Sequence, residues 1–374
     1  MSTIRRLLHR SVPAAAAAAL ILVVALSAAS AAPAAASGTP GWRIVQVLPG
    51  VTSGDELPGL TVGGLAAPGP RDAWLVGTNG ATAIVRHWDG KAWRGLTPPK
   101  DLINSPFDQG IETMTASSAS NLWIFDARGP DSSVINSEAL HWTGRKWAAP
   151  DVINSETIGP VIALSSTDVW AIGDLGVPYH FNGKTWTTAR IPIGVGAFSA
   201  LSATDMWAVG GTSKGFGAAR WNGRTWHVTP TLHLSSAISQ GLIMGAAALT
   251  DSNVWADIWV TVGTPHTVLV HWNGKAWKRA AFPYDAWAPV PGPITADGHG
   301  GLWLGLVTDP YAAAPVYWLA HLSDGRWTKT AVPRWHGRQP AISFMSRIPG
   351  TRSVWGVADT TELPNDTMIL KYGP

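Results

Sequence analysis

Short apolar runs, each closed by turn residues, recur along most of the chain. Four of them lie between Phe198 and Pro230, and two of these flank Asn222-Gly223. The runs are too short for helices, and they lack the apolar–polar alternation of a strand with one exposed face. A short strand without alternation is covered on both faces, and Asn-Gly favours a tight hairpin because both residues tolerate positive φ. This stretch therefore predicts a four-stranded antiparallel sheet packed between two similar sheets.

Two signatures repeat at intervals of about 37 to 52 residues and mark the other sheets. The second signature, for example HWNGKAW from His271, follows each of the first six copies of the first. Four strands per unit at this spacing suit a propeller blade better than a helical solenoid. The first signature is an Asx-x-Trp run that contains Trp74, Trp123, Trp170, Trp207 and Trp255, with degenerate copies at Trp303 and Trp355.

The seventh unit, which begins at Ile342, lacks its outer strand. Its third strand, Ile369–Gly373, is followed by a single residue. We expect the missing strand at the other end of the chain, where Gly41–Val45 has the Trp-then-proline layout of Lys275–Pro283. Closing the ring in this way removes open sheet edges. The sequence therefore predicts an all-β fold, a seven-bladed β-propeller of four-stranded antiparallel blades whose ring is closed by an N-terminal outer strand.

Residues 1–36 are expected to be a cleaved signal peptide, which leaves residues 37–374 as a single propeller domain. Three arginines precede an apolar run from Ala14 to Ala29, and Ala34–Ala36 matches a signal-peptidase site. The run is short for a membrane span, so no span is expected after cleavage. Arg5-Arg6 is also found in twin-arginine signals, but its flanks match that motif poorly, and the general secretory route is favoured. We therefore expect a secreted, extracellular protein.

Composition argues against two kinds of protein. The chain has 27 basic and 24 acidic residues, and three of the basic residues lie in residues 1–36, which leaves 24 of each. A mature chain of this balance lacks the concentrated basic face that nucleic acid requires, so no nucleic-acid partner is expected. The chain contains no cysteine, so a secreted form must hold together without disulfides.

The 22 tryptophans fall into a repeated and an unrepeated set. Eighteen occupy one of three positions that recur from blade to blade, and residues repeated in this way are expected to pack one blade on the next. Trp259, Trp287, Trp318 and Trp335 stand outside the pattern. Trp318 lies in a strand-like run and is expected in the core.

The other three unrepeated tryptophans lie in or beside the long loops of blades five to seven. In a propeller these loops share one face, and long loops on a rigid scaffold commonly carry function. Aromatic platforms beside polar groups suit a sugar, which stacks its C–H face and hydrogen-bonds through its hydroxyls. The alternative is that these aromatics only plug the loops onto the propeller. The candidate ligand-binding residues are Trp259, Trp287, Trp335, Tyr284, Asp285, Tyr311, His336 and Arg338.

No metal site, cofactor or catalytic residue is predicted. Asp297 and His299 lie close together but in a short turn, and no zinc-type spacing occurs. A glycosidase acid pair remains an open alternative among the loop carboxylates. These are Asp108, Glu112, Asp126, Asp131, Glu156, Asp257, Asp309, Asp359 and Glu362. One repeated position indicates a structural hydrogen-bond donor, and it holds His87, His141, His180, His271 and His321, with Arg220 and Lys371 at the equivalent place.

The repeats resemble those of secreted, tryptophan-rich seven-bladed propellers of actinobacteria over Trp42–Gly373. The hairpin Asn182–Trp186 is also similar to the Asp-box turn of sialidase-like propellers, Ser-x-Asp-x-Gly-x-Thr-Trp, of which it keeps the Gly and Trp at a shifted spacing. The Gly-Lys-x-Trp run is similar to blades of quinone-dependent dehydrogenases, whose ring has eight blades. The resemblance implies a fold and carries no activity, because the arginine triad and nucleophilic tyrosine of a sialidase have no match.

The sequence favours a non-enzymatic binding protein. Its expected partner is an extracellular glycan or cell-wall polymer, bound off-centre over blades five to seven rather than in the channel. Two alternatives are a secreted glycoside hydrolase or lyase that uses loop carboxylates, and a protein-interaction scaffold.

Overall fold

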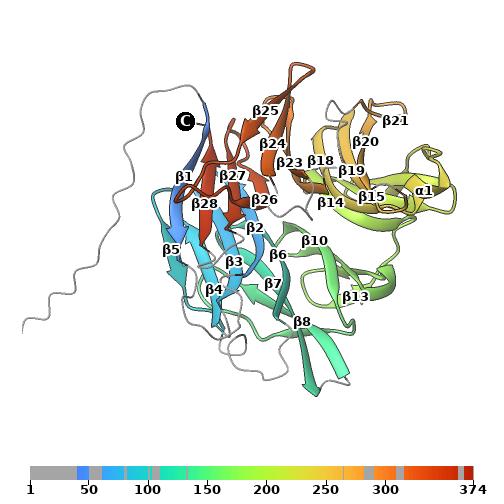
Figure 1. Cartoon of the computed structure of the whole chain (residues 1–374). Coiled ribbons are helices and arrows are strands. Elements are labelled where there is room, and N and C mark those ends of the chain that lie inside the picture. Colours follow the sequence, from blue (N-terminus) through green and yellow to red (C-terminus); the bar gives the residue numbers. More distant parts are fainter. Residues whose placement is uncertain are drawn as a thin grey trace, which may run out of the picture. The chain divides into compact units, whose positions relative to one another are not determined.

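The apolar runs form strands, and the turn residues end them. In a computed structural model the described chain is almost entirely β-structure, arranged as seven four-stranded antiparallel sheets. Each sheet is one blade, so the predicted seven-bladed propeller is confirmed (Figure 1). The predicted signal peptide lies outside the described residues, which are 40–49, 61–79, 82–99, 102, 110–131, 134–263, 265–281, 290–308, 316–360 and 366–373.

Every blade runs from an inner strand beside the channel to an outer strand at the rim. The inner strands are β2 (Thr61–Gly69), β6 (Gly110–Ser118), β10 (Ile158–Ser165), β14 (Gly194–Ser202), β18 (Leu242–Thr250), β22 (Val290–Ala296) and β26 (Ala341–Arg347). The second strands are β3 (Asp72–Asn79), β7 (Asn121–Asp131), β11 (Asp168–Gly173), β15 (Asp205–Thr212), β19 (Asn253–Val260), β23 (Leu302–Thr308) and β27 (Val354–Asp359). The third strands are β4 (Thr82–Trp88), β8 (Val134–Trp142), β12 (Pro178–Phe181), β16 (Gly215–Trp221), β20 (His266–Trp272), β24 (Val316–Ser323) and β28 (Thr367–Tyr372). The outer strands are β5 (Trp93–Leu96), β9 (Asp151–Ile153), β13 (Trp186–Thr188), β17 (Trp226–Val228), β21 (Trp277–Arg279), β25 (Arg326–Ala331) and β1 (Trp42–Leu48).

Two short helical turns, η2 (Asp174–Gly176) and α1 (Ser236–Ser239), lie in connections between strands. Within the described ranges, no helix has the length and apolar character needed to cross a lipid bilayer.

The N-terminal strand closes the ring, as predicted. β1 pairs antiparallel with β28, with Trp42 opposite Tyr372, and the two strands lie side by side in blue and red in Figure 1. The Trp42 indole packs edge-on against Trp303 of blade six, with ring centroids 5.4 Å apart. Arg43 adds a hydrogen bond from its Nη1 to the carbonyl oxygen of Gly373. The first and last described strands therefore belong to one blade.

Pairs of tryptophans pack neighbouring blades together. The tryptophan of a second strand meets the tryptophan of the next blade's outer strand, with ring centroids between 5.2 and 6.4 Å apart. Such aromatic pairs contribute about 0.5–1.5 kcal/mol each beyond their buried area. The repeated tryptophans thus do the structural work predicted for them. The pairs are Trp123–Trp186, Trp170–Trp226, Trp207–Trp277, Trp255–Trp327, Trp303–Trp42 and Trp355–Trp93.

Glycines let the inner strands approach one another closely around the channel. A Cβ atom on Gly196 would lie 2.5 Å from Cβ of Ile243, and one on Gly245 would lie 2.6 Å from Cγ2 of Ile294. Larger residues at these positions would push neighbouring blades apart.

The strands alternate in direction, so their connections fall on two faces. We call the turn face the one that carries the connections from first to second and from third to fourth strands. We call the loop face the one that carries the connections from second to third strands and from one blade to the next.

One local expectation is wrong. In blade two Trp147 does not open the outer strand; it forms an isolated bridge with Trp142, and the strand begins at Asp151. Pro150 has no N–H and interrupts the ladder between these positions.

A hairpin forms at Asn222-Gly223, but its turn spans residues 222–225, and only Gly223 of the pair has a positive φ. Asn222 Oδ1 accepts hydrogen bonds from the backbone N–H groups of Arg224 and Thr225, both at 2.9 Å. Gly223 has φ of +88°, a conformation in which a Cβ is unfavourable.

Candidate functional site

A hydrogen-bonded unit of Asx, Trp and His repeats near the turn face. In blade two, Asn121 Oδ1 accepts hydrogen bonds from Trp123 Nε1 at 3.0 Å and His141 Nε2 at 2.8 Å, and the two rings stack 4.0 Å apart. Asp168 and Asn253 accept the equivalent pairs of bonds in blades three and five. Burial lowers the pKa of His141, which favours its neutral form. The repeated histidines are therefore structural donors, as predicted.

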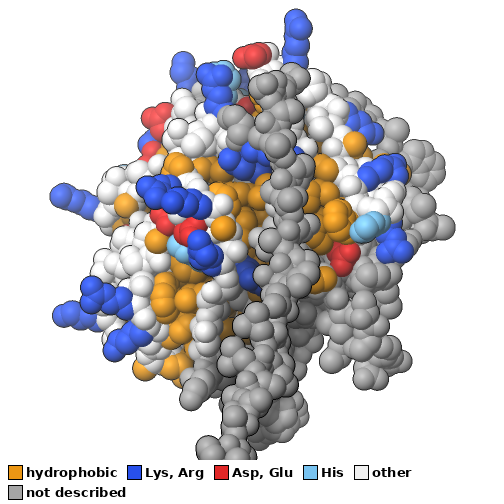
Figure 2. Space-filling model, turned by 90° about the vertical axis from the view of Figure 1, so that its left-hand side faces the viewer, with side chains coloured by type: hydrophobic (Ala, Val, Ile, Leu, Met, Phe, Trp, Pro, Cys, Tyr) orange, Lys and Arg blue, Asp and Glu red, His pale blue; other side chains and the backbone are white. Residues whose placement is uncertain are grey.

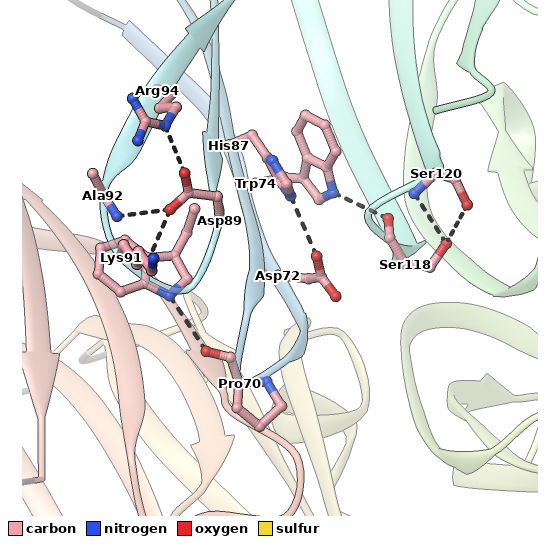
Figure 3. A network of polar contacts seen from close by, with 11 residues as sticks. Pro70, Asp72, Trp74, His87, Asp89, Lys91, Ala92, Arg94, Ser118 and Ser120 are labelled. Atoms are coloured by element: carbon pink, nitrogen blue, oxygen red, sulfur yellow. Dashed lines mark hydrogen bonds and ion pairs between the residues drawn. The ribbon is translucent and has the colours of Figure 1, made fainter. Parts of the chain in front are cut away.

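Blade one contains a looser version of this unit, shown in Figure 3. His87 Nε2 lies 3.4 Å from Asp72 Oδ1, while the Trp74 indole N–H donates to the backbone oxygen of Ser118 at 3.1 Å. Because Ser118 belongs to blade two, this hydrogen bond also joins neighbouring blades.

Blade six has Gly301 where blades one to five have Asx, and Asp297 takes over the contact with the histidine. Asp297 accepts a hydrogen bond from His321 Nε2 at 2.9 Å on Oδ2, and bonds from the backbone N–H groups of His299 and Gly301 at 2.6 and 2.9 Å on Oδ1. Burial by itself would raise the pKa of Asp297, but the hydrogen bonds together outweigh it and lower the pKa. The carboxylate of Asp297 is thus held in place by hydrogen bonds within its own blade. No group of three or more metal-ligating side chains occurs in the described part of the chain.

A tight turn on the loop face carries three of the unrepeated candidates. The backbone groups of Trp335 and Arg338 form two hydrogen bonds with each other, both at 2.9 Å. His336 and Gly337, the two residues of the turn, have φ of +48° and +80° respectively. A two-residue turn with both φ values positive favours Asn-Gly, so His336 is held in a strained conformation. The Trp335 Nε1 donates to Asp366 Oδ2 at 2.8 Å, which fixes the indole.

Within this turn, the side chains differ in exposure. Trp335 is half-buried against the hydrophobic core of blade seven, while His336 and Arg338 are exposed. The imidazole of His336 lies edge-on to the indole, with ring centroids 4.4 Å apart. The turn therefore presents a fixed indole beside two exposed polar side chains.

Trp259 lies at the loop-face end of β19, opposite Leu242 and Thr267. It is half-buried, and its indole N–H has no hydrogen-bond partner among the described residues. It makes no ring contact with Trp335, so the structure brings these two candidates to one face without joining them. Trp318 is buried, as predicted. The other predicted site residues lie outside the described residues: Trp287, Tyr284, Asp285 and Tyr311.

Among the loop carboxylates that are wholly or partly withdrawn from solvent, Glu112, Asp257 and Asp359 come from different blades. Burial raises the pKa of Asp359, although hydrogen bonds from Thr367 Oγ1 at 2.6 Å and Ser343 Oγ at 2.8 Å oppose the shift. None of the three is hydrogen-bonded to another carboxylate of the described chain. Of the other loop carboxylates, Asp126 is buried and Glu156 is exposed, while Asp108, Asp309 and Glu362 lie outside the described residues.

Asp257 is the most isolated of the three. It is fully buried on β19, and burial raises its pKa to about 8. The backbone amides of Asp257 and Gly245 are near enough to favour the ionised form in part. Neither carboxyl oxygen, however, accepts a well-aligned hydrogen bond from a described residue.

A cavity of about 490 Å³ lies in the loop-face half of the channel. Six of the seven inner strands line it, each with residues near the start of the strand. Sequence analysis placed the ligand away from the channel and missed this cavity. The glycines that recur near the starts of the inner strands were the available signal.

Exposed hydrophobic side chains also favour the loop face. Figure 2 views the molecule from the side on which β1 and β5 lie in Figure 1, and there hydrophobic side chains gather near the middle with Lys and Arg side chains around them. The large hydrophobic residues that stand most exposed in the described chain are Val152, Leu175, Val228, Leu242, Met244, Val262 and Val316. All but Val152 and Val228 belong to loop-face connections or to the adjoining ends of strands.

Leu175 is the extreme case, and sequence analysis missed it. It is 98% exposed in η2 and has φ of +55°. The turn is nevertheless fixed, because Asp174 N–H donates to Ser155 Oγ at 2.9 Å and Tyr179 Oη donates to the Asn154 carbonyl at 2.7 Å. A rigid turn thus presents an unshielded apolar side chain.

The chain was compared with known proteins. No family model matches the sequence, and no curated protein matches it. Solved propellers match the fold. YCF48 bound to D1 peptide has a TM-score of 0.55 at 14% identity, covering 89% of this chain and 97% of that one.

Two further solved structures have comparable similarity. The GH74 xyloglucanase from Xanthomonas campestris has a TM-score of 0.58 at 13% identity, covering 86% of this chain and 54% of that one. U3-55K has a TM-score of 0.54 at 11% identity, covering 88% and 98%. At these identities the similarity establishes a propeller fold and no more.

Proposed function

We propose that the protein is a secreted, non-enzymatic binding propeller that recognises an extracellular glycan or cell-wall polymer on its loop face, over blades five to seven. The turn of residues 335–338 carries this proposal. A strained residue held by a rigid turn is a recurrent mark of functional sites. Trp335 offers a fixed apolar surface, and His336 and Arg338 offer polar groups at its edge, which is the combination that a sugar requires.

Trp259 supports the proposal from the neighbouring blade. Its indole is half-buried and offers apolar surface at the loop-face end of β19, where a sugar could stack, while its N–H group is buried. Trp287, Tyr284, Asp285 and Tyr311 are proposed to complete the site. We propose further that residues 1–36 direct export and that the hairpins such as Asn182–Trp186 are degenerate Asp-box turns.

The two alternatives have less support. A hydrolase needs two carboxyl groups on either side of the scissile bond, whereas Asp126 and Asp257 are fully buried and out of reach of a polysaccharide. The fold is compatible with protein ligands, since a solved neighbour is described as bound to a peptide. The exposed hydrophobic residues of the loop face favour that second candidate, a protein-interaction scaffold.

A glycan array probed with the purified protein tests the proposal. Binding should fall by about tenfold or more in Trp335→Ala, the usual scale for an aromatic anchor. Trp335→Phe keeps an aromatic ring and should retain part of the binding. Binding should also fall in His336→Ala but not in His299→Ala, an exposed histidine on the turn face.

Three results would contradict the proposal. They are the absence of any glycan ligand, release of reducing sugar from a bound polysaccharide, and equal binding by the His336→Ala and His299→Ala proteins. Export is tested separately by sequencing the N-terminus of protein recovered from the culture medium, which should begin close to Ser37.

A further inference from the structure

The cavity in the channel is distinct from the proposed glycan site. Its walls are mixed: polar atoms share the surface with the apolar side chains of Met114, Phe198, Met244, Ile294 and Phe344. Its volume falls in the range of pockets for small molecules, roughly 300–1,000 Å³. The cavity is thus large enough for a small ligand and offers it apolar as well as polar surface.

One acid lies in this wall. Glu112 is the only ionisable residue among the described residues that line the cavity. Its Oε2 atom accepts hydrogen bonds from Ser137 Oγ at 2.9 Å and from the backbone N–H of Ile158 at 3.1 Å. Ser137 is itself fully buried, so the carboxylate is held in a fixed position.

Glu112 is partly desolvated without a cation to compensate. No Lys, Arg or His of the described chain forms an ion pair with it. Burial accordingly raises the pKa of Glu112, and its two hydrogen bonds offset this only in part. A cation that reached Glu112 would therefore be stabilised by a carboxylate that is not fully hydrated and has no ion-pair partner among the described residues.

Groups behind the cavity wall do not provide that cation either. Asp257 lies behind Gly245, where a Cβ would come within 3.3 Å of its Oδ1. Asp359 is bonded to Ser343, next to Phe344 of the lining. The titratable groups nearest the described wall are thus acids, and none of them is a cation that would attract an anionic ligand.

Apolar side chains continue from the cavity to the loop face. Met244 is 43% exposed and Leu242, at the start of the same strand, is 55% exposed. The exposed side chains of Met244 and Leu242 belong to an inner strand, and they form an apolar surface that an apolar ligand would cover.

We propose that the loop-face half of the channel binds a small amphipathic amine, an apolar chain that ends in an ammonium group. The ammonium group pairs with Glu112, and the apolar chain lies along Met244, Phe198 and Phe344. This site is independent of the glycan site, and either proposal can fail without the other.

Calorimetric titration with n-octylammonium, n-octanol and n-octanoate at neutral pH tests the assignment. Octylammonium should bind, octanol should bind about tenfold more weakly for want of the charge-assisted contact, and octanoate should not bind detectably. A short apolar peptide with a single lysine serves as a second source of the same ammonium group. If it binds more tightly than octylammonium, a peptide side chain is the occupant.

Variants locate the site. Glu112→Gln should weaken octylammonium binding about tenfold and leave octanol binding unchanged. Met244→Lys places a cation at the partly exposed mouth of the cavity and should also weaken octylammonium binding about tenfold. Glu156→Gln removes an exposed acid outside the cavity and should leave octylammonium binding unchanged. Thermal melts confirm that each variant is folded.

Two outcomes overturn the proposal. One is octanoate binding as well as octylammonium does. The other is octylammonium binding that is the same in the Glu112→Gln, Met244→Lys and Glu156→Gln proteins.

Discussion

Asp297 near the turn face and Asp257 near the loop face are both buried aspartates, yet their environments differ completely. Asp297 accepts hydrogen bonds from His321 and from two backbone N–H groups, and its pKa is lowered. Asp257 has no well-aligned hydrogen bond among the described residues, and its pKa is raised to about 8. The first is therefore ionised in the folded protein, and the second holds a proton at neutral pH.

The contrast extends to the two faces as wholes. Near the turn face, Asn121, Asp168, Asn253 and Asp297 each accept a hydrogen bond from the histidine of their blade, and these contacts stabilise the ring. The notable groups of the loop face occur once: a buried Asp257, a strained His336 and an exposed Leu175. Features that cost stability and do not repeat are candidates for function.

The largest expected effect is on the pH dependence of stability, through Asp257→Asn. The pKa of Asp257 is about 8 in the fold and about 3.9 in an unfolded chain, so the folded state holds a proton that the unfolded state has released. The contribution of Asp257 to the free energy of unfolding is fully present below about pH 4. It is lost as the pH rises to about 8, by up to about 1.4 kcal/mol per pH unit. The amide side chain of the variant would be neutral throughout, so its urea unfolding should lack this slope. Identical slopes for the two proteins would contradict the assignment.

The second prediction compares tryptophans of the two sets. Trp207 is 1% exposed and contacts Trp277 of the next blade. Trp207→Ala should therefore lower the free energy of unfolding by about 3–5 kcal/mol. Trp335 is only half-buried, so Trp335→Ala should cost clearly less in the same denaturation experiment. Equal losses would mean that the loop-face turn belongs to the core.

Asp297→Ala should have a smaller effect of the opposite pH dependence. It removes the acceptor for His321 and for two backbone N–H groups, at a cost of about 1–3 kcal/mol at neutral pH. Because the pKa of Asp297 is lowered in the fold, its contribution is present above the unfolded pKa and is lost as the pH falls. Thermal melts should therefore separate wild type and variant at pH 7 and bring them together in acid. A difference that persists in strong acid would refute the ionic role of Asp297.

The smallest effect is expected for Leu175→Asn. Asn tolerates positive φ better than Leu, so the variant should gain up to about 1 kcal/mol of stability. Val262→Asn, at another exposed apolar position of the loop face, is the control and should show no such gain in a thermal melt. If Leu175→Asn is destabilising, Leu175 has packing contacts that its exposure conceals.

The fold could be predicted because its determinants repeat. Seven copies of one Trp position, and a Trp at residue 42 that matches the outer strands, were sufficient to derive the ring and its closure. Trp147 broke the pattern because Pro150 displaced the strand that should follow it. Repetition also identified the structural histidines before any contact was known.

The candidate site could be predicted only in part, because nothing on the loop face repeats. Trp259 and Trp335 could be selected as exceptions to a pattern, and both lie on that face. The strain at His336 and Leu175 depends on backbone torsions that residue types do not report. The channel cavity is formed by six separate strands, and no single stretch of sequence contains it.

The pairing of β1 with β28 has a consequence for how the chain acquires its structure. Trp42 and its partner Tyr372 are separated by almost the whole sequence. During synthesis the first strand must wait without its partner until the last strand is available. Contacts of such long sequence separation slow folding and leave strand edges exposed meanwhile. The joining of the two chain ends is thus expected late in folding, and removal of β1 would leave blade seven with three strands and the edge of β28 exposed.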